Sequence, residues 1–297
     1  MLETPPEPTK SILLTGAGFT KNFGGFLADD MRSFIVDKIM KHQRLVKLLN
    51  SSTLNYEDVY AKVIHGRYSK DDKSALTDAF GYVYKRLDDV IRGVSWESNA
   101  PHGVNIYGVK NFLDRFGSTV NGKRGYFFTL NQDLFIERWY GQETLLKIPG
   151  NLNLSRMDAF PQRELESNDY LPVPTTNKID TIRAEDNKKT SSSGRYHYLK
   201  LHGSFNWYDG KDPERRIMVI GGQKLEQIEN QPILRYYNEK FREVLTQPSR
   251  KVCVIGYSFR DKHINDIIRE ALTKMRPQTL RNFSPDSFCI RTTNYQG

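Results

Sequence analysis

The sequence predicts an α/β fold in which a parallel sheet is covered by helices on both faces. Short apolar segments alternate along the chain with helical patterns, as in strand–helix–strand units. Most of these segments are continuously apolar rather than alternately apolar and polar, which is typical of strands buried on both faces. Several of them end in glycine or in polar residues. We therefore expect ligand-binding positions at one edge of the sheet.

Composition indicates a globular chain, and we interpret residues 1–297 as a single domain. Hydrophobic residues make up 38% and charged residues 27%, which excludes a disordered protein. The longest apolar runs are strand-sized and far shorter than the roughly 20 residues that cross a bilayer, so no membrane association is expected. The N-terminus lacks the basic and apolar stretch of a secretory signal, which favours a cytoplasmic protein.

Charge and cysteine content restrict the ligands. The net charge of +9 favours polyanions or phosphate-bearing ligands, but no basic block is longer than a pair, so direct nucleic-acid binding stays an open alternative. Two cysteines, Cys253 and Cys289, exclude a disulfide scaffold and a zinc site of three or four thiolates, and leave open a zinc site that also uses histidines. We expect both in buried strands.

The first half of the chain predicts two strands that end in polar turns. Residues 10–15 form a strand that leads into Gly16-Ala17-Gly18, and a helical pattern runs from about residue 25 to residue 49. Apolar stripes at helical spacing predict two helices between residues 55 and 92, and we interpret residues 51–105 as a helical insertion. A second strand at residues 125–129 leads to Asn131 and Asp133, followed by a helix at 134–140.

The second half contains an interruption and then further alternation. Residues 141–195, with four prolines and a Ser-rich tract, are interpreted as an irregular insertion. Strands are then predicted at residues 196–201, 216–220, 251–255 and 287–292, and helices at 232–245 and 261–274. This order predicts a Rossmann-like sheet. Four polar strand ends, which begin at Gly16, Asn131, His202 and Gly256, should converge on one crevice.

Each of these strand ends has a chemical and a structural interpretation. Gly16 and Gly18 before a helix would let a pyrophosphate approach backbone amides, or would form a plain tight turn. His202, between an apolar strand and a glycine, could accept a proton near neutral pH or serve the structure alone. Asn131 could hold a water or hydroxyl, and Asp133 could accept a hydrogen bond from an amide or ribose or cap the following helix.

The remaining histidines do not predict a metal site. The other five show no metal-ligand spacing, so we expect no metal. His263 and Asn265 are expected in packing or capping roles rather than at a ribose. Asp261 is expected to cap a helix, and Trp207 to lie in the core or in a pocket wall.

In their order along the chain, these motifs resemble the NAD-binding domain of sirtuins over roughly residues 10–275. The motifs are Gly16-Ala17-Gly18-Phe19-Thr20, the segment 129–133, Leu201-His202-Gly203 and the segment 255–259. The resemblance implies that Gly16, Ala17, Gly18 and Thr20 line the pyrophosphate and that Asn131 holds the nicotinamide ribose. It further implies that Asp133 contacts the carboxamide, that His202 is the catalytic base, and that Gly256 and Ser258 bind the adenosine half.

Departures from deacetylating sirtuins point to a particular branch. The stretch from residue 203 to 251 contains no cysteine, so the zinc ribbon with its two Cys-x-x-Cys pairs is missing. Leu-His-Gly-Ser-x-Asn-Trp at 201–207 and Gly-Tyr-Ser-Phe-x-Asp-x-His-Ile-Asn at 256–265 instead resemble sirtuin-like proteins of bacterial anti-phage systems.

This resemblance implies hydrolysis of NAD as a substrate, and defence by depletion of NAD. It also implies a homo-oligomer or a partner ATPase of the HerA type as the source of control. The alternative from another class is a sensor that binds NAD or ADP-ribose without turnover; the presence of both Asn131 and His202 disfavours it. A nuclease is disfavoured because no paired acidic motif lies at the strand ends, and a protein deacylase because the zinc ribbon is missing.

Overall fold

A computed structural model describes residues 10–51, 54–93, 106–116, 125–140, 146–147, 164–166, 169–186, 196–210, 212–247, 250–279 and 288–291. Its centre is a six-stranded sheet in the order β3-β5-β2-β1-β8-β9, and every pair of neighbours is parallel. The strands are β1 (Lys10–Thr15), β2 (Gly125–Thr129), β3 (Leu146–Lys147), β5 (Tyr196–Lys200), β8 (Arg250–Ile255) and β9 (Phe288–Arg291). The predicted α/β class is confirmed.

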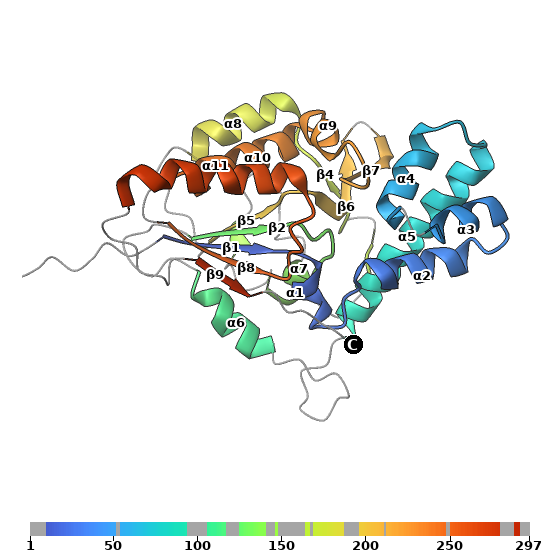
Figure 1. Ribbon diagram of the computed structural model, residues 1–297, viewed down its shortest axis with the longest axis horizontal. Helices are drawn as coiled ribbons and strands as arrows, with labels where there is room; N and C mark the ends of the chain where they lie inside the picture. Colours follow the sequence, from blue (N-terminus) through green and yellow to red (C-terminus); the bar gives the residue numbers. More distant parts are fainter. Residues whose placement is uncertain are drawn as a thin grey trace, which may run out of the picture.

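The central strands form where the sequence is continuously apolar. Ile12, Leu13 and Leu14 of β1 are fully buried, as is Phe128 of β2. A strand can bury consecutive side chains, which point to opposite faces, only when helices cover both faces of its sheet. Helices α8 (Thr176–Asp186), α10 (Pro232–Leu245) and α11 (Lys262–Thr279) lie on one face and α6 (Ile106–Asp114) on the other (Figure 1).

The pairing register brings four strand ends into one row. Thr15 of β1 is paired with Thr129 of β2 and with Ile255 of β8, and Thr129 is paired with Lys200 of β5. Because the strands are parallel and in register, the residues that follow each of these four emerge at the same edge of the sheet.

A bundle of four helices lies beside this edge (Figure 1). It comprises α2 (Ala28–Lys38), α3 (Gln43–Leu49), α4 (Tyr56–His65) and α5 (Lys70–Arg92), and we call it the helical module. Asn55 and Ser69 cap α4 and α5 by accepting from backbone amides three residues on. The two helices predicted between residues 55 and 92 are confirmed. The helical pattern predicted from about residue 25 to residue 49 does not form one continuous helix: the chain turns after α2, which lets Ile39 and Leu45 both be buried.

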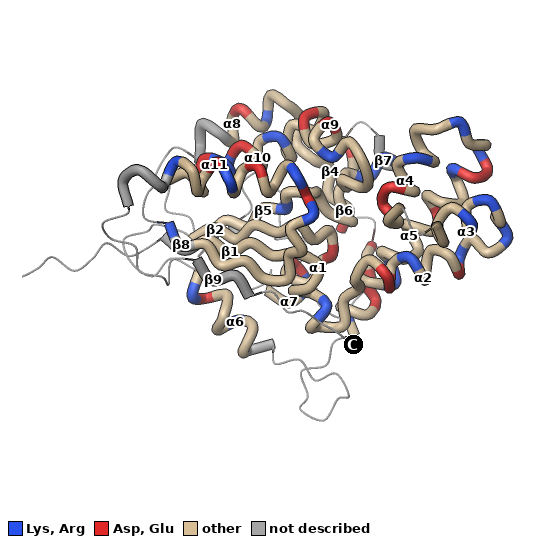
Figure 2. The backbone as a smooth tube through the Cα atoms, viewed as in Figure 1, with Lys and Arg blue, Asp and Glu red and all other residues tan. Residues whose placement is uncertain are grey.

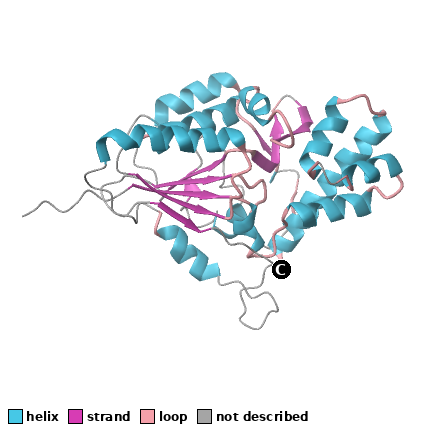
Figure 3. Ribbon diagram, viewed as in Figure 1, coloured by secondary structure: helices cyan, strands magenta, loops and turns pink. Residues whose placement is uncertain are grey.

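The chain after β5 departs most from prediction. Gly203 (φ +77°) turns the backbone directly after His202 and starts β6 (Gly203–Asp209), which pairs with β7 (Asp212–Met218) and β4 (Leu171–Pro172) in a separate small sheet (Figure 3). The predicted strand at 216–220 is therefore wrong in its bounds, and β6 was not predicted. β6 was not recognised in the sequence because it contains the polar residues Ser204 and Asn206. Both are fully buried, and both are satisfied by hydrogen bonds.

Residues 141–195 are only partly irregular. The interpretation is wrong for α8, β3 and β4, which lie in this range, while the Ser-rich tract lies outside the described residues. The domain interpretation of residues 1–297 and the insertion bounds stay predictions. Cys253 is half-buried in β8, and Cys289 belongs to β9, although its side chain lies outside the described part.

The charged residues lie mainly on the helices around the sheet, and both signs are mixed there (Figure 2). This mixing does not single out a basic surface for nucleic acid. Among the helices described, none is both long enough and apolar enough to cross a bilayer.

Candidate functional site

The predicted site residues follow four adjacent strands at one edge of the sheet. Gly16 follows β1 and Gly256 follows β8, while Asn131 and His202 each lie two residues beyond the paired positions Thr129 and Lys200. The in-register ends explain why residues far apart in sequence share one edge.

The glycine turn packs against the turn that follows β8. Gly16 N–H donates to Ile255 O over 3.0 Å, and Gly18 N–H donates to Gly256 O over 2.9 Å. A Cβ on Gly16 would lie 2.6 Å from Gly256 O, so a larger residue would force the two turns apart. A tight turn thus accounts for these glycines. The short helix α1 (Ala17–Lys21) follows, with Ala17 exposed, and a role of Gly16, Ala17 and Gly18 at a pyrophosphate stays a prediction.

Thr20 links the two polar residues that follow β2. Its hydroxyl accepts from Asn131 Nδ2 over 2.6 Å and donates to Asp133 Oδ2 over 2.8 Å. The backbone N–H of Asn131 donates to Thr129 Oγ1, which also accepts from the Thr15 hydroxyl. Thr20, Asn131 and Asp133 are therefore brought together as one hydrogen-bonded group.

Asp133 has two structural partners. Its Oδ1 accepts from Phe135 N–H over 3.0 Å at the start of α7 (Phe135–Tyr140), so the capping interpretation is confirmed, and its Oδ2 accepts from Thr20. Burial raises the pKa of Asp133, and the positive charge of Lys200 opposes this rise. The carboxylate is half-buried and can accept further hydrogen bonds.

A buried ion pair below this group was not predicted. Lys200, 1% exposed, donates to Glu137 Oε1 over 2.7 Å and also to the backbone carbonyl of Asp133. Burial raises the pKa of Glu137, while the charge of Lys200 lowers it. A lysine at the end of an otherwise apolar strand was the signal in the sequence, because such a charge requires a partner when buried.

His202 is nearly buried, with 4% of its surface exposed. Its Nε2 lies 3.0 Å from His263 Nε2, and its backbone carbonyl accepts from Gln132 Nε2 over 3.3 Å. Burial, followed by the positive charge of Lys224, lowers the pKa of His202 to about 3. The imidazole is therefore neutral at physiological pH.

His263, at the start of α11, and Asp261, just before this helix, were not expected in the site. The Asp261 carboxylate pairs with Lys224 Nζ over 2.7 Å, an interaction that the capping prediction did not include. Lys224 also pairs over 2.8 Å with Glu57 of α4, so the helical module reaches this cluster. Burial would raise the pKa of Asp261, but its electrostatic interaction with His202 and the positive charge of Lys224 lower this pKa.

Ligand atoms of His202, Asp261 and His263 all lie within 4.8 Å of one another, close enough to hold a metal ion. Linear spacing did not predict this group, because β5 and α11 meet only in the folded chain. The expectation of no metal stays a prediction.

Three further predicted positions can be assigned. Asn265 has a packing role, because its side chain accepts from Tyr257 OH and donates to Phe259 O. Trp207 is 2% exposed and packs against Tyr237, as a core aromatic. Ser258 is exposed beside Gly256, and its contact with adenosine stays a prediction.

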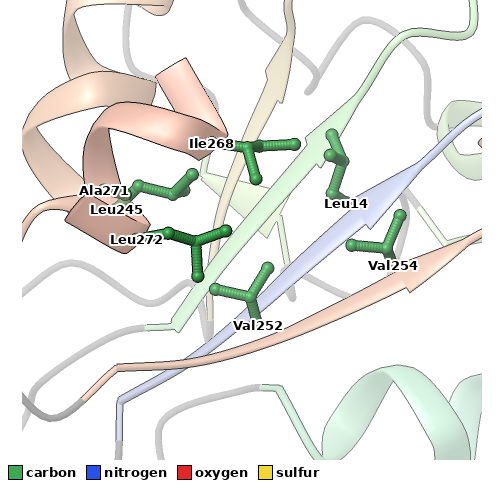
Figure 4. Close-up of a pocket in the computed structure, with 7 residues that line it drawn as sticks. All are labelled: Leu14, Leu245, Val252, Val254, Ile268, Ala271 and Leu272. Carbon is green, nitrogen blue, oxygen red and sulfur yellow. The ribbon is translucent and has the colours of Figure 1, made fainter. Parts of the chain in front are cut away.

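A separate apolar pocket lies between the sheet and the helices α10 and α11 (Figure 4). Its seven lining residues are all apolar: Leu14, Leu245, Val252, Val254, Ile268, Ala271 and Leu272. With no polar group to orient a charged ligand, this pocket is part of the core packing.

The fold and site define an α/β protein with a polar site at the carboxyl edge of a parallel sheet. The family model described as SIR2-like domain matches residues 125–288, more than half of the chain, and the chain belongs to this family. Proteins of this family are generally NAD-dependent enzymes, which indicates an NAD-related function. The match includes Asn131, His202 and Gly256, whereas the Gly16 turn precedes it. No curated protein matched the sequence.

Proposed function

We propose that this protein is an NAD⁺ glycohydrolase that cleaves NAD⁺ into nicotinamide and ADP-ribose. The observation that carries the proposal is the placement of Asn131 and His202 at equivalent positions beyond two paired strands, with Thr20 bonded to Asn131. This edge offers an amide, a hydroxyl, a carboxylate and a neutral imidazole. These groups suit a ligand that combines ribose hydroxyls with a carboxamide.

The reaction requires few groups, because nicotinamide leaves as a neutral molecule from a cationic substrate. Asn131 positions the attacking water, and Asp133 orients the carboxamide of nicotinamide. The water adds to the ribose carbon as the glycosidic bond breaks, and its proton goes to His202. His202 is neutral before the reaction and so has a lone pair for this proton, although burial also makes it a weak base.

The biological context is the finer part of the proposal and rests on the resemblance of the motifs at 201–207 and 256–265. NAD⁺ hydrolysis would deplete the cofactor during phage infection. An unregulated enzyme of this kind would kill its host. Activation would therefore come through homo-oligomerisation or a HerA-type partner ATPase.

The test is chromatography of NAD⁺ after incubation with the purified chain, alone and with a partner encoded nearby. We expect release of nicotinamide and ADP-ribose that is abolished in His202→Ala and Asn131→Ala. The exposed residues His65 and Asn50 supply the matched controls His65→Ala and Asn50→Ala, which should keep full activity. Undiminished hydrolysis in His202→Ala would refute the assignment. Binding of NAD⁺ without hydrolysis in both conditions would favour the sensor.

A further inference from the structure

The contact between His202 and His263 limits how His202 can accept a proton. Their Nε2 atoms lie 3.0 Å apart, so one nitrogen donates a hydrogen bond and the other accepts it. A neutral imidazole carries a single N–H. His202 therefore either donates through Nε2 and keeps a free lone pair on Nδ1, or accepts through Nε2 and carries its proton on Nδ1. Only the first arrangement leaves a base while the contact is kept.

We propose that His263 is a positioning residue that accepts a hydrogen bond from His202 Nε2–H and thereby keeps the Nδ1 lone pair of His202 available to the substrate. The inference rests on the proposed function, because it takes His202 as the base. When Nδ1 takes the proton of the attacking water, His202 becomes an imidazolium. Its Nε2–H bond to His263 is then charge-assisted and stronger, which stabilises the charge that develops during the reaction.

The cluster around His263 holds this contact in place. Ile264, which follows His263 on α11, is fully buried and anchors this turn of the helix in the core. Lys224 ties Asp261, two residues before His263, to Glu57 of α4. The charged groups that face the two histidines are Asp261, Lys224 and, at His263, Asp266. The negative charge of Asp261 favours an imidazolium at His202, and Lys224 opposes it.

The pairing of Asp261 favours this interpretation over a metal site. Its Oδ1 already accepts from Lys224 Nζ over 2.7 Å. A metal ion held by His202, His263 and Asp261 would lie close to this ammonium group, which repels a cation. A proton between the two imidazoles satisfies both facing nitrogens without that repulsion, and Lys224 already satisfies Asp261.

The first test reads the tautomers directly and does not depend on catalysis. The full chain is labelled with ¹⁵N-histidine, and its six histidines are assigned by substitution. We expect His202 in the Nε2–H form and His263 in the Nδ1–H form. In His263→Gln, whose carbonyl can accept, His202 should keep the Nε2–H form, whereas His263→Ala should give a mixture. A wild-type His202 in the Nδ1–H form would overturn the proposal.

The second test measures NAD⁺ hydrolysis. His263→Ala should lower kcat at least about 10-fold with little change in KM, and His263→Gln should recover most of this loss. The exposed His65→Ala is the matched control. Equal kcat values for His263→Ala and the wild type would overturn the inference. If the wild type hydrolyses no NAD⁺, the proposed function fails by itself, and the tautomers still decide whether the contact exists.

The third test uses Zn²⁺ alone as the probe. In calorimetric titrations, the wild type should bind no more Zn²⁺ than the Asp261→Asn variant does. Asp71→Asn, at a carboxylate whose side chain is 87% exposed, is the control. One bound Zn²⁺ per chain that is lost in Asp261→Asn and kept in Asp71→Asn would reassign the cluster as a metal site.

Discussion

Thr20 Oγ1 lies 2.6 Å from Asn131 Nδ2, so a residue of α1 holds the polar side chain that follows β2. The same hydroxyl donates to Asp133, and both contacts depend on a single oxygen atom. Thr20 is 3% exposed, which means that water cannot readily replace this oxygen. Thr20 therefore orients the side chains of Asn131 and Asp133 without being one of the reacting groups itself.

Thr20→Val should therefore lower NAD⁺ hydrolysis while the fold is retained. The substitution keeps the shape of the side chain but leaves the Asn131 amide without its acceptor. We expect a decrease in kcat/KM of about 10- to 100-fold, from the usual cost of an unsatisfied polar group. Thr20→Ser should restore much of the activity, and Thr77→Val, at an exposed position on α5, should have no effect. Equal rates for Thr20→Val and the wild type would show that Asn131 is oriented by other means.

Gly256→Ala should be severely destabilising. Gly256 has φ +65°, and an added Cβ would lie 2.1 Å from Phe19 N. This backbone atom cannot move away without displacing the chain around it. We expect a loss of about 2–4 kcal/mol in the free energy of unfolding, from the left-handed backbone and overpacking together. Urea denaturation provides the measurement. The control is Gly222→Ala, since Gly222 is exposed and a Cβ there would have no neighbour within 4 Å.

Lys200→Met should destabilise the protein more than a double variant does. The single change leaves Glu137 buried without its cation, and breaking a buried pair costs about 3–5 kcal/mol. Glu137→Gln in the same chain removes the stranded charge and keeps an acceptor for Tyr198 OH. Urea unfolding of the two single variants and the double variant measures the coupling. Additive losses would show that the two groups stabilise the fold independently.

Stability should fall as the pH falls below about 6.5, in part because of His202. The pKa of His202 is about 3 in the folded chain, against about 6.5 for an unfolded histidine. Between these values the unfolded chain binds more protons, so acidification favours unfolding, by up to about 1.4 kcal/mol per pH unit for one group. The contribution is fully present above pH 6.5 and is lost towards pH 3.

Urea unfolding at several pH values between about 7.5 and 4.5 checks this sign. His202→Gln should have a shallower pH dependence than the wild type, and the exposed His65→Gln should match the wild type. Identical slopes for His202→Gln and the wild type would mean that His202 is not held neutral by burial.

The local pattern of apolar residues was sufficient to predict helices and strands whose positions depend on burial alone. The helix predicted at residues 232–245 coincides with α10, which starts at Pro232, a residue favoured at the first helical position. The strands predicted at 10–15 and 125–129 coincide with β1 and β2. In contrast, β6 was missed because its pattern contains the polar residues Ser204 and Asn206. These residues can be buried only because the folded chain supplies their partners: Ser204 donates to Asn206, and Asn206 donates to the distant carbonyl of Asp169.

The sequence by itself determined the fold class and the segments that end at the site, because apolar runs and the glycines after them are local properties of the chain. Only the tertiary structure decided which side chains meet. Pairing of β5 beside β2 aligned His202 with Asn131, and packing of α11 brought His263 to within 3.0 Å of His202. The physical reason is that hydrogen bonds and charges act over a few ångströms, and residues separated by 61 positions reach that distance only through the folded core.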